Sequence, residues 1–101
     1  MNKIINGKKY STDTAKCVAC WENGYGHGDF QYAEEQLYRK KTGEFFLYGE
    51  GGPMSGYAES YGNETYGSEK IIPLSDDEAR EWAEDHLDGD EYEEIFGPVE
   101  E

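Results

Sequence analysis

The chain contains 101 residues, of which 23 are acidic and nine are basic, and its formal net charge is −14 at pH 7. This length suits one domain, residues 1–101, with a single modest core, and it excludes a two-domain enzyme with an interdomain cleft. The charge argues against direct binding to DNA, RNA or an anionic membrane, because the field of the protein repels polyanions.

The composition favours a folded cytoplasmic protein. Two tryptophans, nine tyrosines and four phenylalanines are more aromatic residues than a disordered acidic chain usually carries. The N-terminal stretch MNKIINGKKY lacks the apolar segment of a signal peptide, and no run approaches the roughly 20 apolar residues of a membrane span. Cys17 and Cys20 are therefore expected to be reduced thiols.

The first element in chain order is a small β-hairpin. Lys3–Ile5 and Lys8–Tyr10 have the composition of short strands, and they flank Asn6-Gly7. An Asn-Gly pair between two such segments is a strong signal for a two-residue hairpin turn.

An N-terminal helix is predicted over Thr12–Glu22. Ser11 or Thr12 can cap it through a side-chain oxygen, and Asn23 followed by glycine is a stop signal. Apolar residues recur at i, i+3 and i+4, and others widen that face, so we expect a helix that is buried over more than a stripe. These residues are Ala15, Val18 and Ala19, widened by Cys17, Cys20 and Trp21.

A second hairpin is predicted in the centre of the chain. Apolar and polar residues alternate over Phe30–Lys41 and again over Glu44–Tyr48, around a turn that contains Gly43. A three-residue loop would place Leu37 and Arg39 on one face with Phe45 and Leu47, and Tyr38 on the other with Phe46 and Tyr48. A two-residue loop would change this pairing, and the sequence leaves both registers open.

The segment after this hairpin is predicted to be mostly irregular. Gly49–Ser68 is rich in glycine, tyrosine and serine and shows no period, so we expect a long loop with a short helical turn near Ser55–Ser60. Glu69–Leu74 is predicted to be a strand, with Pro73 favouring its end or an edge position.

One or two acidic helices are predicted at the C-terminus. Ser75 and Glu78 form a capping box, and Ala79, Trp82, Ala83 and His86 follow at the spacing of a buried face, widened by Leu87. A final short helix is expected over Asp90–Phe96, with Tyr92, Ile95 and Phe96 inward. The elements together predict an α+β fold. A small antiparallel sheet, made of the two hairpins and one further strand, packs with the N-terminal helix and one or two acidic C-terminal helices.

No motif for catalysis, metal binding or a cofactor is complete. Cys17 and Cys20 have a metal-like spacing, but only His27 and His86 remain as further ligands, so packing inside the N-terminal helix is the favoured explanation. The glycine-rich loops lack the lysine and serine or threonine of a nucleotide site, and the run from Asp85 does not fit a calcium loop. We therefore expect no metal, no cofactor and no enzymatic activity.

A small basic segment, Arg39-Lys40-Lys41, lies at the tip of the central hairpin. Three charges beside so many acidic residues are expected to balance Glu34, Glu35 and Glu44 rather than to bind phosphate.

The acidic residues of the C-terminal helices are the candidate partner-binding site. Residues three or four apart on a helix lie about 5–6 Å apart, so the carboxylates form a row on a rigid scaffold. Ser75–Glu101 contains thirteen acidic residues and one base, Arg80, whereas ordinary surface helices mix both signs. A solvated face that keeps the protein soluble is the alternative explanation. The candidate residues are Asp77, Glu78, Glu81, Glu84, Asp85, Asp88, Asp90 and Glu91.

Three segments resemble a group of small acidic proteins encoded by phages and mobile elements of Gram-positive bacteria, some of which are anti-CRISPR proteins. They are INGKKYSTDTA at 5–15, LYRKKTGEFFLYGEGGPMS at 37–55 and KIIPLSDDEAREWAE at 70–84. The resemblance implies a protein that inhibits a CRISPR effector in the bacterial host cytoplasm, with a Cas9-type nuclease as the first expectation. Such an effector holds its heteroduplex in a positively charged channel. An acidic surface would occupy that channel in place of DNA.

The expected partner is therefore a basic protein surface, on a CRISPR effector or on an effector–guide RNA complex. Two other functions stay open. One is an accessory enzyme that acts on the guide RNA or the effector with a site around Tyr25, His27 and the glycine loops. The other is an interaction module that binds an unrelated host protein. The sequence leaves the oligomeric state open.

Overall fold

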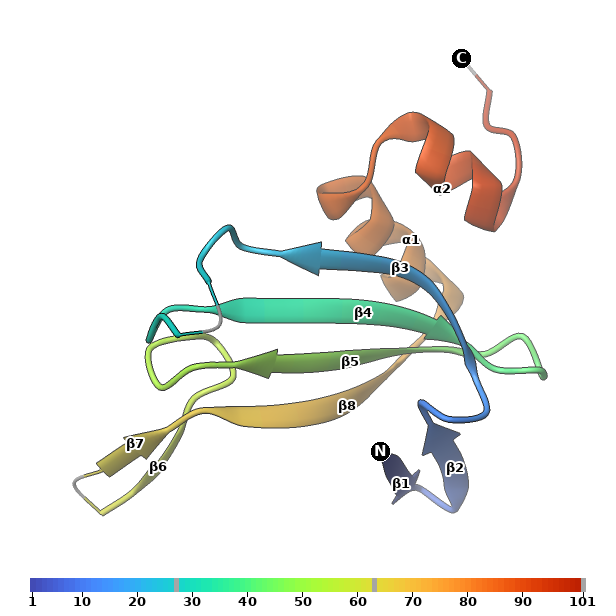
Figure 1. Cartoon of the computed structure of the whole chain (residues 1–101). Helices are drawn as coiled ribbons and strands as arrows, with labels where there is room; N and C mark the ends of the chain where they lie inside the picture. Colours follow the sequence, from blue (N-terminus) through green and yellow to red (C-terminus); the bar gives the residue numbers. More distant parts are fainter. Residues whose placement is uncertain (27, 63, 101) are drawn as a thin grey trace.

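The computed structural model describes residues 1–26, 28–62 and 64–100, and this part of the chain contains eight strands followed by two helices (Figure 1). The strands are β1 (Asn2–Ile5), β2 (Lys8–Ser11), β3 (Lys16–Glu22), β4 (Ala33–Arg39), β5 (Phe45–Gly51), β6 (Glu59–Tyr61), β7 (Glu64–Tyr66) and β8 (Ser68–Leu74). The helices are α1 (Asp76–His86) and α2 (Gly89–Phe96). The predicted α+β class, with antiparallel sheets and two C-terminal helices, is confirmed.

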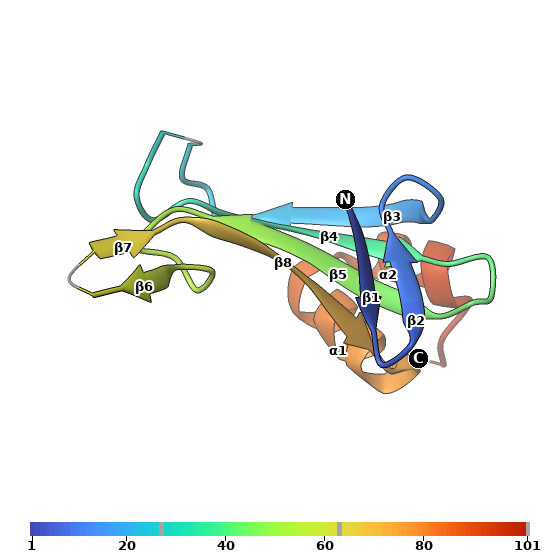
Figure 2. The same cartoon turned by 90° about the horizontal axis from the view of Figure 1, so that it is seen from below.

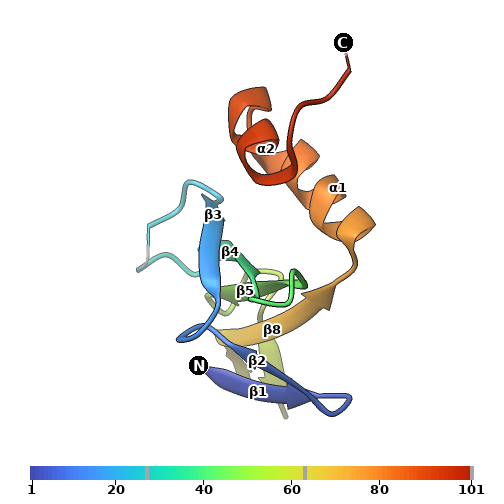
Figure 3. The same cartoon turned by 90° about the vertical axis from the view of Figure 1, so that its right-hand side faces the viewer.

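The main sheet has four antiparallel strands in the order β3-β4-β5-β8. The helices and the β1–β2 hairpin lie on opposite sides of this sheet (Figure 3). The β6–β7 hairpin projects beyond one end of it (Figure 2). Both outer strands, β3 and β8, are edges, and Pro73 lies on one of them, where a missing N–H is tolerated.

Each face of the sheet carries its own apolar cluster. On the helix side, Leu37, Phe45 and Leu47 pack against Ala79, Trp82 and Ala83 of α1. On the other side, Phe46 and Ile71 pack against Tyr10 of the N-terminal hairpin. The alternation of side chains along β5 explains why consecutive residues Phe45, Phe46 and Leu47 serve two cores.

The two predicted hairpins are confirmed. Asn6 and Gly7 have φ values of 52° and 78°, the left-handed pair that a type I′ turn requires. In the central hairpin, Arg39 pairs with Phe45 and Leu37 with Leu47, which is the register of the three-residue loop. Gly43 takes the left-handed position of that loop, with φ of 94°.

The predicted helix over Thr12–Glu22 is wrong, because this segment contains the edge strand β3. Its residues pair with β4 from Lys16↔Arg39 to Glu22↔Glu34, with a bulge between Cys17 and Ala19. Eleven residues are marginal for an isolated helix, whereas pairing with β4 satisfies the backbone and lets Val18, Ala19 and Trp21 pack against the helix-side core. The bulge breaks the two-residue alternation that would have identified a strand.

The predicted loop over Gly49–Ser68 is also partly wrong. β5 continues to Gly51, and Glu59–Tyr61 pairs with Glu64–Tyr66 in another small hairpin. Residues 52–58, between these strands, form turns and bends, and the helical turn predicted near Ser55–Ser60 is not found there. Gly49 lies inside a strand because the ring of Tyr57 covers it, and a Cβ there would come within 2.1 Å of that ring. Because glycine has no side chain, it does not contribute to the alternation of apolar and polar residues by which a strand is recognised in a sequence.

The helix boundaries follow from two capping boxes. Ser75 and Glu78 exchange hydrogen bonds at the start of α1, as predicted. Asp88 and Glu91 do the same for α2, which begins at Gly89 and ends at Phe96, followed by the C-cap residue Gly97 with φ of 92°. Ala79, Trp82 and Ala83 are buried as predicted, and Tyr92, Ile95 and Phe96 of α2 pack against the same core while half-buried.

Polar contacts of Glu35 join the sheet to α1. Glu35 of β4 points to the helix side and its side chain is only 17% exposed. Trp82 donates its indole N–H to Glu35 over 3.1 Å, the hydroxyl of Tyr57 donates to the other oxygen, and Nε2 of His86 lies 3.8 Å away. Burial and the hydrogen bond to Glu35 raise the pKa of Tyr57, so the phenol remains a donor.

Replacement of Glu35 by leucine is expected to destabilise the protein. The substitution leaves the donors of Trp82 and Tyr57 without an acceptor, and each desolvated donor costs about 1–3 kcal/mol. Glu35→Gln keeps one acceptor oxygen and should cost less. Urea unfolding measures the free energy of unfolding of both variants, which should be lower for Glu35→Leu than for Glu35→Gln. A leucine variant as stable as the wild type would contradict this role for Glu35.

Candidate functional site

The predicted partner-binding residues all lie on the surface of the two C-terminal helices. Each is exposed, and they fall on α1, at its junction with α2 and in the first turn of α2. They are Asp77, Glu78, Glu81, Glu84 and Asp85 on α1, Asp88 at the junction, and Asp90 and Glu91 on α2.

Three of these carboxylates have structural tasks. Glu78 accepts a hydrogen bond from the backbone of Ser75 at 2.9 Å, and its hydrogen bonds with Ser75 lower its pKa. The carboxylate of Asp88 accepts a hydrogen bond from the backbone N–H of Glu91 at 2.8 Å, and the carboxylate of Glu91 accepts one from the backbone N–H of Asp88 at 3.5 Å. Because they hold the helix ends, substitution of these residues would disturb the fold and not only the surface.

The other five carboxylates form what we call the acidic helical surface: Asp77, Glu81, Glu84, Asp85 and Asp90. Within the described residues, none of the five makes an ion pair or a hydrogen bond through its side chain. Arg80, the one base of this segment, turns away from them. Its guanidinium lies 4.7 Å from the ring centre of Phe96 and donates to the hydroxyl of Tyr92 at 3.4 Å.

A hollow of about 330 Å³ lies between α1 and α2 beside this surface. Its carboxylates come from Glu84, Asp88 and Glu93, and its apolar lining includes Ala83 and Leu87. A lining that combines apolar side chains with carboxylates suits a lysine or arginine side chain, whose stem is apolar and whose end is charged.

A second acidic feature crosses the opposite face of the sheet, and sequence reasoning missed it. Four glutamates occupy directly paired positions on four adjacent strands: Glu22↔Glu34, Glu34↔Glu50 and Glu50↔Glu69. Neighbouring strands lie about 4.8 Å apart, so the row places like charges side by side. We call it the glutamate row.

Tyrosine and glutamine side chains reduce the repulsion within the glutamate row. The hydroxyl of Tyr48 lies 2.6 Å from Glu69 and 2.9 Å from Glu50, and it can donate its single proton to one of them at a time. Tyr32 donates to Glu34, which also accepts from Gln36 at 3.0 Å. Burial and these carboxylates raise the pKa values of Tyr32 and Tyr48, which keeps both phenols protonated.

The cysteines do not pack inside a helix as predicted, because both are exposed on β3. The bulge brings Cys17 opposite Tyr38 and Cys20 opposite Gln36, which puts both on the same face. Burial of part of the side chain and the nearby Cys20 raise the pKa of Cys17. Within the described residues, no three His, Cys, Asp or Glu side chains are grouped as a metal site.

The histidines differ in what the structure shows of them. His27 lies outside the described residues. His86 lies between two tryptophans, with ring centres 4.4 Å from Trp21 and 5.1 Å from Trp82, and beside Glu35. Tyr25, the other residue considered for an accessory enzyme, is exposed.

Comparison with protein-family models, with curated proteins and with solved structures finds no match for this chain. Neither helix in the described part of the chain is long and apolar enough to cross a membrane. Function is therefore argued from the geometry and charge of the surface.

Replacement of one glutamate of the row by glutamine is expected to stabilise the protein. Glu22 is exposed at one end of the row, and removing a like charge opposite Glu34 should gain about 0.2–1 kcal/mol. Glu100→Gln removes the same charge from an exposed site outside the sheet and serves as the control. The gain over this control should shrink at high salt. Equal unfolding free energies for the two variants at low salt would contradict the repulsion.

Proposed function

We propose that this protein is a binding inhibitor that occupies the basic, nucleic-acid-binding surface of a partner protein in the bacterial cytoplasm. The observation that carries the proposal is the acidic helical surface, where five exposed carboxylates lack counter-ions within the described residues. A carboxylate without an internal partner is available to a lysine or arginine of another molecule.

The scaffold beneath these carboxylates supports this proposal. α1 is capped at Ser75, is anchored by Trp82 and Ala83 in the core, and is joined to α2 by the second capping box. A surface that is already ordered loses little conformational entropy when it binds. A disordered acidic tail of the same charge would lose more.

A CRISPR effector is the first partner to test, and a Cas9-type nuclease is the first choice among effectors. Its channel for the heteroduplex is positively charged, and it reads its flanking motif with arginines. The hollow between α1 and α2 could receive one such side chain, while the acidic helical surface lies against the neighbouring bases. Binding of this kind excludes DNA by competition and weakens as salt increases.

The decisive variant reverses three charges of α1: Glu81→Lys, Glu84→Lys and Asp85→Lys. All three residues are exposed and outside the capping boxes, so the helices should still form. Inhibition of DNA cleavage by an effector–guide RNA complex should weaken by at least about tenfold, since like charges now face each other across the interface. Titration of the inhibitor in a cleavage assay measures this change.

The matched control reverses three exposed acidic residues elsewhere, Asp13, Glu59 and Glu100, and produces the same net charge. This control should inhibit much as the wild type does. Equal inhibition by the α1 variant, folded by circular dichroism, would remove the acidic helical surface from the mechanism. Inactivation of excess effector by substoichiometric protein would instead favour an enzyme.

A further inference from the structure

Most bases of this acidic protein gather at one end of the molecule. The tip of the central hairpin, predicted to balance nearby glutamates, is joined there by bases from β2, β3 and α1. Lys16 pairs with Arg39, Lys9 lines a hollow with Lys40 and Lys41, Lys8 binds Glu44, and Arg80 lines a hollow with Arg39. Seven of the nine basic residues of the chain thus lie in one region.

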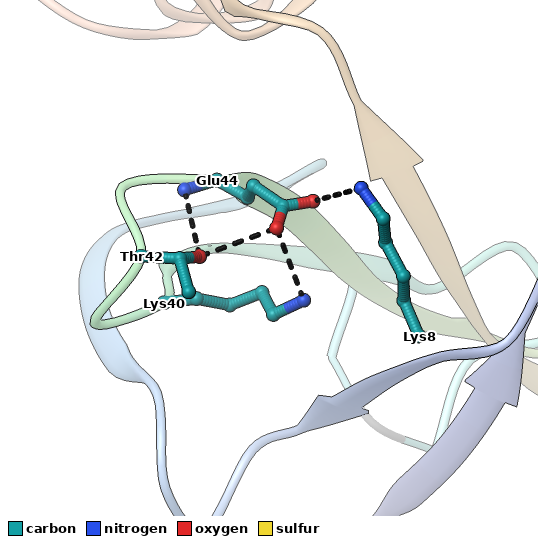
Figure 4. A network of polar contacts seen from close by, with 4 residues as sticks. All are labelled: Lys8, Lys40, Thr42 and Glu44. Atoms are coloured by element: carbon teal, nitrogen blue, oxygen red, sulfur yellow. Dashed lines mark hydrogen bonds and ion pairs between the residues drawn. The ribbon is translucent and has the colours of Figure 1, made fainter.

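The acidic residues expected to neutralise this region are mostly engaged elsewhere. Glu34 belongs to the glutamate row and Glu35 binds Trp82. Glu44 is held by two lysines, with Nζ of Lys8 at 3.4 Å and Nζ of Lys40 at 3.6 Å (Figure 4). Partial desolvation opposes ionisation of Glu44, but its contacts with Lys8 and Lys40 outweigh it and lower the pKa.

The two arginines remain without a carboxylate. In the described part of the chain neither makes an ion pair, and each guanidinium lies over an aromatic ring instead. Arg39 is 5.4 Å from the ring centre of Phe45, Arg80 is 4.7 Å from that of Phe96, and the two rings are 5.4 Å apart. Stacking on a ring fixes a guanidinium and leaves the N–H groups at its edge able to donate; one of those of Arg80 is directed at the hydroxyl of Tyr92.

Both arginines line one hollow of about 430 Å³, which we call the two-arginine hollow. Thr42 and Glu44, whose charge is paired with two lysines, line it as well. Asp76 is the one carboxylate of the lining that has no basic partner in the described chain. Asp76 precedes Arg80 by four residues, yet no contact joins them, because Arg80 turns toward Tyr92 and Phe96.

We propose that the two-arginine hollow is a binding site for a phosphate group. Arginine forks donate paired hydrogen bonds to phosphate oxygens, and two forks in one hollow match an anion that carries several oxygens and more than one charge. The site does not depend on the proposed inhibitor function, since its donors are not part of the acidic helical surface. A free phosphate, a nucleotide or a nucleic-acid strand can supply the same group.

The test is an NMR titration of the full chain with inorganic phosphate at constant ionic strength. Saturable shifts of the Arg39 and Arg80 side-chain N–H signals are expected, with a dissociation constant on the order of 1 mM. Arg39→Gln and Arg80→Gln should each weaken binding by about tenfold or more, as expected for the loss of hydrogen bonds to a charged group. Shifts that do not saturate, or wild-type affinity in both variants, would overturn the proposal.

Three further variants separate the site from general charge. Lys70→Gln removes one exposed positive charge from β8, away from the hollow, and should leave the affinity unchanged. Asp76→Asn should strengthen binding by about two- to fivefold, because it removes an exposed opposing charge. Arg80→Lys keeps the charge without the fork and should bind more weakly than wild type. An effect of Lys70→Gln as large as that of Arg80→Gln would refute the site.

The source of the phosphate is identified by two more probes in the same titration. Adenosine monophosphate and a short single-stranded oligonucleotide are compared with inorganic phosphate, each with the arginine variants. Tighter binding of the oligonucleotide that requires both arginines assigns the site to a nucleic-acid strand. Equal binding of all three assigns it to a single phosphate group.

Discussion

The hydrogen bonds of Glu35 are the constraint on which the arrangement of this molecule depends. A carboxylate beneath a helix is costly unless donors surround it, and here the donors come from α1 and from the segment after β5. Gly49, opposite Glu35 on β5, makes room for Tyr57 to reach it. The position of α1 on the sheet is therefore set by a polar contact as well as by apolar packing, and the acidic helical surface takes its direction from that position.

Local signals in the sequence predicted the parts of the fold that local physics determines. Each of these features, the Asn6-Gly7 turn, the loop at Gly43 and the capping box at Ser75, is formed by residues only a few positions apart in the chain. The sequence therefore predicts each of them directly. β3 depends instead on pairing with β4, and its bulge removes the alternation that identifies a strand. The helical spacing of Ala15, Val18 and Ala19 was a coincidence, since Ala15 packs on one face of the sheet and the other two on the opposite face.

The charged surfaces likewise divide into one that the sequence predicts and others that only the strand register assembles. The acidic helices were visible in the sequence because their residues are neighbours along the chain. The glutamate row and the cluster of bases were not, because their members come from different strands and the register alone brings them together. Glu34 and Glu35 show the difference most clearly. They are consecutive residues, yet one belongs to the glutamate row on one face and the other binds Trp82 on the opposite face.

Segregation of charge gives this small protein surfaces of opposite character, and α1 contributes residues to both. The net charge of −14 governs its long-range field, and a field of that size steers the molecule toward basic surfaces before any contact forms. The stacked arginines act only at short range, inside a hollow whose lining also holds the opposing carboxylate of Asp76, because salt screens more distant exposed charges. The two proposals together favour a partner on which a basic groove borders an accessible phosphate. An effector that already holds its guide RNA presents both features, whereas a free basic protein presents only the first. That difference makes the effector–guide RNA complex, rather than the free effector, the proposed partner to test first.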